Sequence, residues 1–116
     1  MTKHASYLIE GPDGRKIPVD LHVPEVGNDR VPVIIFLHGI GERGNGSSEL
    51  WKVKRIAIPN YIANGNKMRF QKDGKWHSFI VLSPQCAMKY SMWPTLYVDA
   101  MIEYAEKNLR IDKNRI

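Results

Sequence analysis

The chain has 116 residues and a mass of 13.3 kDa, which limits it to at most one small domain. Its longest apolar run, residues 33–37, is far too short to cross a membrane, and its composition is ordinary for a globular protein. The formal net charge of +5 is concentrated in residues 50–89, where eight lysines and arginines accompany one acid, Asp73. Charge alone rarely specifies a partner, so we expect a solvated basic face and no nucleic-acid partner.

The N-terminal part, residues 5–23, predicts a β-hairpin. Residues 7–10 and 16–23 have strand composition, and Gly11-Pro12-Asp13-Gly14 between them is typical of a turn. Pro18 lacks a backbone donor, which predicts that its strand lies at a sheet edge or is interrupted there. Residues 24–29 read as a polar loop.

Residues 31–65 predict a unit with a buried strand and short helices. Residues 31–37 are apolar on both alternating faces, as expected for a strand between two helical layers. The glycine-rich stretch 38–46 comes next, and a helix is predicted to begin after a serine cap, Ser47 or Ser48. A second short helix near residues 59–63 should end at Asn64-Gly65, and residues 72–75 predict another turn.

Residues 77–111 predict a second strand and helix unit. Residues 79–82 form another apolar strand, and from Thr95 apolar residues recur at helical spacing up to residues 108–111. Glu103 and Lys107 stand four apart on the polar side of this helix. Residues 112–116 read as the lead-in to a further strand. The alternation of strands and helices predicts an α/β fold, an antiparallel hairpin followed by parallel strands with crossover helices.

Residues 39–44 match the dinucleotide-binding pattern G-x-G-x-x-G. That pattern should follow the first strand of its unit and be followed about 20 residues later by an acidic residue that binds the ribose. Two strands precede the motif here, and no Asp or Glu occurs between Glu49 and Asp73. A phosphate-binding Walker loop is excluded because Asn45-Gly46 replaces the required Lys-Ser/Thr.

The run Leu-His-Gly-Ile-Gly-Glu-Arg-Gly at 37–44 resembles the loop that follows an early strand in α/β-hydrolases. It is close to a group that includes carbohydrate esterases, feruloyl esterase-like and phospholipase/carboxylesterase-like enzymes. Ser-Pro-Gln-Cys at 83–86 followed by Trp93, and the closing residues 110–116, also resemble segments of these enzymes. The resemblance covers nearly the whole chain and implies the N-terminal, incomplete portion of an α/β-hydrolase sheet.

The resemblance also implies roles for residues of the glycine-rich loop. The backbone N–H of Ile40, helped by Gly41, would donate to the oxyanion of a tetrahedral intermediate. Glycines would supply unusual backbone angles and close approach. Four residues would support the loop: His38, Gly39, Glu42 and Arg43. Of these, His38 would orient the loop without acting as a catalytic base. Tyr90 and Trp93 would line a substrate cleft.

No G-x-S-x-G nucleophile motif occurs in the sequence, so we expect the nucleophile, acid and base to lie beyond Ile116. The complete protein would then be a serine hydrolase of carboxylic esters, carbohydrate-linked esters among the candidates, and this chain alone would be inactive. Two alternatives stay open: a nucleotide-binding α/β domain that uses the G-x-G-x-x-G loop, and a non-catalytic interaction module with a basic face.

The remaining histidines and the single cysteine predict no further site. His4, His22 and His77 have no metal-ligand spacing, and Cys86 has no partner for a disulfide or for catalysis, so we expect no metal and no cofactor. The N-terminus has no apolar signal segment, which favours the cytoplasm. The expected partner is a small-molecule or glycan ester, and an exposed sheet edge is expected to permit self-association.

Overall fold

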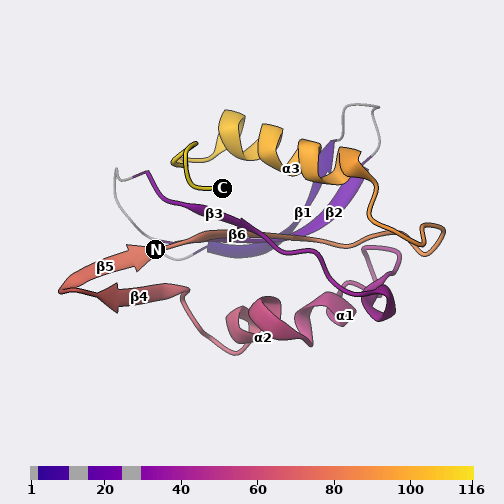
Figure 1. Cartoon of the computed structure of the whole chain (residues 1–116). Coiled ribbons are helices and arrows are strands. Elements are labelled where there is room, and N and C mark those ends of the chain that lie inside the picture. Colours follow the sequence, from indigo (N-terminus) through magenta and orange to yellow (C-terminus); the bar gives the residue numbers. More distant parts are fainter. Residues whose placement is uncertain (1–2, 11–15, 25–29) are drawn as a thin grey trace.

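The computed structural model describes residues 3–10, 16–24 and 30–116, and its centre is a four-stranded sheet in the order β1-β2-β6-β3 (Figure 1). Strands β1 (Lys3–Glu10) and β2 (Lys16–Val23) pair antiparallel, with Glu10 opposite Lys16, so the predicted hairpin is confirmed. The predicted turn at 11–14 lies outside the described residues, as does the predicted loop beyond residue 24.

The two strands predicted as buried lie side by side. Strand β6 (Ile80–Pro84) pairs antiparallel with β2 and parallel with β3 (Val33–Ile35), which is shorter than the predicted 31–37. Strand β3 is the last in the sheet order. The C-terminal residues lie along the other side of β3: Val31 forms a parallel bridge with Ile111, and the Val33 N–H donates to the Arg115 carbonyl at 2.9 Å. Residues 112–116, predicted to lead into a further strand, therefore begin to pair with β3.

Helices lie on both faces of the sheet (Figure 1). Helices α1 (Trp51–Lys54) and α2 (Ala57–Ala63) lie on one face, and α3 (Thr95–Asn108) lies on the other. The larger core cluster joins the sheet to α3, and the smaller one joins Val81 to α2. Because Val33 belongs to the larger cluster and Ile34 packs against the smaller, successive side chains of β3 enter opposite layers. This confirms the prediction of a strand between two helical layers.

Two local predictions were wrong. Pro18 lies in β2, which is an inner strand of the sheet and not an edge strand. The Pro18 carbonyl accepts from the N–H of Gln85 at 2.9 Å, and Gln85 comes just after the last residue of β6. The N–H that Pro18 lacks therefore falls where the pairing between β2 and β6 ends. The helix after the glycine-rich stretch has no serine cap. Instead the Asn45 Oδ1 accepts from the N–H groups of Ser47 at 2.9 Å and Glu49 at 3.0 Å, and α1 begins at Trp51.

A second hairpin, formed by β4 (Arg69–Lys72) and β5 (Lys75–Ser78), was not predicted. Only the turn between its two strands was predicted, and the positive φ values of Asp73 (52°) and Gly74 (76°) confirm that turn. Every side chain of the two strands except Ser78 is exposed, so no alternating apolar pattern marked them. None of the helices within the described ranges is long and apolar enough to span a bilayer.

Candidate functional site

The loop formed by residues 38–46 follows β3 and carries the proposed oxyanion donors. Its first part is a 3₁₀ turn, η1 (Ile40–Glu42). The Glu42 carboxylate accepts from the Gly39 N–H at 3.1 Å while the Glu42 N–H donates to the Gly39 carbonyl at 3.2 Å. Within the described part of the chain, the N–H groups of Ile40 and Gly41 have no acceptor, and both residues are exposed. Two backbone donors are thus left for a ligand.

The His38 ring is buried and bonded on both sides by backbone groups. Its Nε2 accepts from the Cys86 N–H at 2.9 Å, so its Nδ1 carries the proton and donates to the Gly39 carbonyl at 2.6 Å. Burial lowers the pKa of His38 below its usual 6.5, which keeps the ring neutral. A second proton would have to sit on Nε2, facing another donor. This ring is therefore suited to hold the loop, and a catalytic base needs an Nε2 that is open to substrate.

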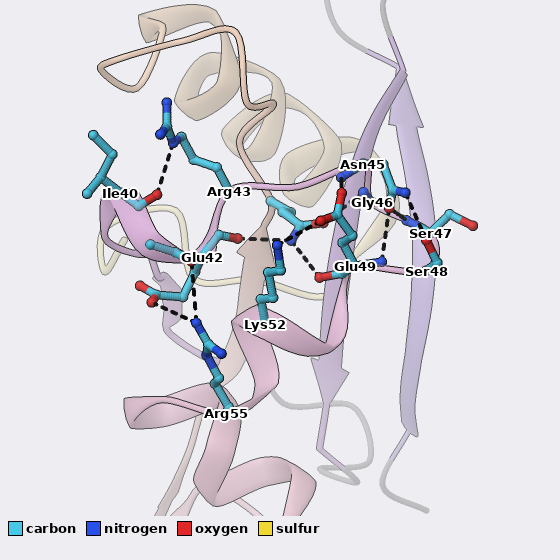
Figure 2. A network of polar contacts seen from close by, with 12 residues as sticks. Ile40, Glu42, Arg43, Asn45, Gly46, Ser47, Ser48, Glu49, Lys52 and Arg55 are labelled. Atoms are coloured by element: carbon cyan, nitrogen blue, oxygen red, sulfur yellow. Dashed lines mark hydrogen bonds and ion pairs between the residues drawn. The ribbon is translucent and has the colours of Figure 1, made fainter.

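Arg43 fastens the far end of η1 to the chain that follows β6. Its Nε donates to the Ile40 carbonyl at 2.9 Å, and its Nη1 donates to the carbonyls of Met88 at 3.0 Å and Tyr90 at 2.7 Å. Figure 2 shows the Arg43 to Ile40 bond and, below it, Glu42 directed toward Arg55. The Glu42 to Arg55 separation of 3.9 Å, between partly exposed groups, contributes little stability.

Gln85, at the end of β6, is a support that the sequence did not reveal. Its side chain is 1% exposed, and its Nε2 donates to the carbonyls of Glu42 at 2.9 Å and Glu49 at 2.8 Å. Its Oε1 accepts from the Gly46 N–H at 2.8 Å. One carboxamide therefore holds three points of the loop and the approach to α1. The one relevant signal in the sequence is that Gln85 comes directly after a strand predicted to be buried.

The glycines of the loop act differently from the expectation. Gly39 and Gly41 have ordinary negative φ values, and a Cβ on Gly41 would meet no described atom within 4 Å. At Gly44 a Cβ would come within 2.7 Å of the Gln85 side chain. Gly46 has a φ of 71°, and a Cβ added there would overlap the Pro18 ring. Close packing therefore requires glycine at the second half of the loop, away from the proposed oxyanion donors.

A small pocket with a volume of about 50 Å³ lies beside the loop, and its lining includes both predicted cleft residues, Tyr90 and Trp93. The Trp93 Nε1–H donates to the His38 carbonyl at 2.9 Å, and the two rings are 4.6 Å apart between centroids. Cys86 also lines the pocket; burial raises the pKa of its thiol, so the reactive thiolate is disfavoured. The structure thus brings His38, Ile40, Arg43, Tyr90 and Trp93 around one cavity.

The other candidate sites give no comparable arrangement. Among residues 3–10, 16–24 and 30–116, no three His, Cys, Asp or Glu side chains are grouped as metal ligands would be. In the basic segment, two arginines lie over exposed indole rings: Arg55 over Trp51 at 5.1 Å and Arg69 over Trp76 at 4.6 Å from the ring centroids. These pairs lie on α1 and on the second hairpin, outside the lining of the pocket.

Comparison with known proteins gives a match in structure alone. No protein-family model matches the sequence, and no curated protein matches it. A thermostable esterase of known structure is similar over 97% of this chain, with 26% identity and a TM-score of 0.63. A proposed dienelactone hydrolase from Klebsiella pneumoniae subsp. pneumoniae MGH 78578 is similar over 99%, with 12% identity and a TM-score of 0.57. An α-amino acid ester hydrolase is similar over 97%, with 11% identity and a TM-score of 0.52.

These similarities establish the class of fold. The chain has the fold of part of an α/β-hydrolase, with a mixed sheet and helices on both faces, and the likeness supports the α/β-hydrolase superfamily. It spans about a third of the esterase (32%), 48% of the proposed dienelactone hydrolase and 20% of the amino acid ester hydrolase.

Proposed function

We propose that this chain supplies the oxyanion loop of a serine hydrolase that cleaves carboxylic esters. The observation that carries the proposal is the pair of exposed N–H groups of Ile40 and Gly41, which have no acceptor among the described residues. They lie directly after β3, on a loop that His38, Arg43 and Gln85 fasten to the rest of the fold. The ester hydrolases among the structural neighbours support the same reaction class.

In the proposed reaction, a serine attacks the ester carbonyl and the oxygen gains negative charge in the tetrahedral intermediate. Rigid N–H donors that point at this oxygen stabilise the transition state without reorganising. The amide of Ile40 would be the main donor and that of Gly41 the second. The ester C–O bond then breaks, and the alcohol leaves with the proton that the catalytic base took from the serine. Water, deprotonated by the same base, releases the acyl group from the serine as a carboxylic acid. A framed serine elbow is absent from residues 1–116, so the chemistry needs further protein segments, and we propose that the chain alone is inactive.

We favour this function over nucleotide binding because no suitable helix comes directly after the glycine-rich loop. A dinucleotide site places pyrophosphate at the N-terminus of a helix that adjoins the glycines. Here the next α-helix begins only at Trp51 and has four residues, while the loop itself packs on Gln85. Titration with NAD, monitored by tryptophan fluorescence, would detect the rival site.

The test uses a form of the protein that carries the chain together with a downstream G-x-S-x-G elbow. Ile40→Pro removes the proposed donor and should lower kcat by about 10²–10³-fold. Ile40→Ala keeps the amide and is the matched control, expected to cost far less. If folded proteins with the two substitutions lose equal activity, the side chain matters and the amide does not, and the oxyanion role is wrong.

A further inference from the structure

The pocket beside the loop has an unbalanced charge. Arg43 is the one charged side chain in the described lining of this pocket, and neither Asp nor Glu is among the lining residues. His38 contributes a neutral ring. Tyr90, Ser91 and Trp93 contribute polar but uncharged groups. A half-buried positive charge in such a lining attracts a negatively charged ligand.

The bonding of Arg43 leaves part of its guanidinium available. Its Nε and Nη1 donate to three carbonyl oxygens, which hold the group in place but carry no full negative charge. In the described part of the chain, its Nη2 has no acceptor, and no carboxylate forms an ion pair with it. Arg55, in contrast, approaches Glu42 at 3.9 Å. Arg43 thus has no direct carboxylate partner among the described residues and keeps two N–H donors, while the Glu42 carboxylate is held on the Gly39 N–H.

The position of Arg43 fixes where that charge acts. Its Nε binds the carbonyl of Ile40, the residue whose N–H is the proposed oxyanion donor. Ile40 and Arg43 also line the same pocket, so an ester bound there would share one cavity with the guanidinium. A guanidinium binds a carboxylate through short charge-assisted hydrogen bonds.

We infer that the pocket takes esters that carry a carboxylate near the reacting carbonyl, and that Arg43 binds this carboxylate. The inference rests on the proposed function only in taking the ligand to be an ester; it does not require that the protein hydrolyses that ester. Arg43 is then a specificity-determining residue as well as a support of the loop.

The experiment measures binding to the longer protein used in the test above, with its elbow serine replaced by alanine, so it does not depend on catalysis. The probes are monomethyl succinate, which carries one carboxylate, and dimethyl succinate, its neutral analogue. The readout is the NMR signal of the Trp93 indole N–H, which lies in the pocket lining and donates to His38. We expect the anionic ester to bind about tenfold more tightly than the neutral one, and this preference to shrink as salt is raised.

Three variants test whether Arg43 causes the preference for the anionic ester. Arg43→Gln keeps amide donors for the carbonyl oxygens but removes the charge, and should abolish the preference. Arg43→Lys keeps the charge and should retain part of it. Lys72→Gln removes an equal charge at the tip of the second hairpin, at the other end of the molecule (Figure 1), and should leave the preference intact.

Equal affinities for the two esters in the folded longer protein with Arg43 intact, or no saturable binding of the anionic one, would overturn the inference even if Arg43→Gln failed to fold. A preference that persists in folded Arg43→Gln would overturn the role of Arg43. Anion-selective binding that coexists with failed hydrolysis in the longer protein would leave this inference standing and count against the proposed function alone.

Discussion

The outer edge of β3 is expected to control how the chain behaves in solution. The N–H groups of Val31 and Val33 donate away from β6, to Arg110 and Arg115, while the Phe36 N–H donates to Leu82 of β6 at 2.9 Å. By the alternation of a strand, the N–H and C=O of Ile35 point to the same outer side as Val33, beyond the end of the 110–115 contact. Unpaired edge groups on an apolar strand favour association with another strand.

Ile35→Pro tests this edge, and Phe36→Pro is the matched control on the inner side. In a two-fold pairing of edges, Ile35→Pro removes one donor from each copy, about 1 kcal/mol each, which weakens the dimer about 30-fold. Because the Ile35 N–H points outward, the fold should be retained. Phe36→Pro removes a ladder bond to the buried Leu82 and should lower the free energy of unfolding by about 1–3 kcal/mol without a specific effect on association.

Sedimentation velocity over a concentration series gives the dissociation constant, and hydrogen exchange reports whether β3 is protected. We expect the unsubstituted chain to be marginal: paired with a copy, aggregated or partly unfolded. A monodisperse monomer at every concentration, with the amides of Ile34, Ile35 and Phe36 strongly protected, would refute this reasoning. An unchanged dissociation constant in folded Ile35→Pro would show that any dimer uses another surface.

Three further outcomes are expected. Gln85→Leu should lower the free energy of unfolding by about 3 kcal/mol in urea titrations, because three backbone groups lose their partner, whereas Gln71→Leu on the exposed hairpin should change it by less than about 0.5 kcal/mol. The folded-state pKa of His38 is lowered below 6.5, so its contribution to stability is present above that pH and is lost as the pH falls through the folded-state pKa; the unfolding free energy from pH 8 to 5 should fall more steeply than in His38→Gln. Finally, p-nitrophenyl acetate turnover by the 116-residue chain should not exceed background, and saturable turnover that survives repurification would contradict this.

The strongest patterns in the sequence predicted the fold because they reflect burial. Residues 31–37 and 79–82 are apolar on both faces, and a strand covered on two sides is the arrangement that buries most of such side chains. Leu37, beyond the end of β3, is the exception and is exposed. The helix that begins at Thr95 was predicted by the same reasoning with helical spacing, and its Glu103 to Lys107 pair is present at 2.6 Å. These features depend on local periodicity, which a single sequence shows directly.

The missed features depend on contacts between distant residues. Gln85 bonds to groups 36, 39 and 43 residues away, so no local pattern identifies it. Gly44 is required because Gln85 lies against it, and that closeness exists only once β6 is placed beside β3. The predicted serine cap is absent because the chain turns before the helix begins, and the Asn45 side chain bonds the backbone of that turn. The glycine-rich motif thus predicted a candidate site but not the reason for each glycine.

The contacts around the loop also bear on how the site is assembled. His38, Arg43 and the backbone of Glu42 and Gly46 all bind groups between residues 85 and 90, which come after β6. Strands β3 and β6 are parallel neighbours, so the loops after them leave the sheet at the same edge and can fasten one another. The Ile40 and Gly41 amides are therefore positioned by interactions within this chain. Stabilisation of an oxyanion depends on donors that are fixed before charge develops. Under the proposed function, a serine supplied by another segment would meet these two donors already in place, and the rate effect of Ile40→Pro would measure how much they contribute.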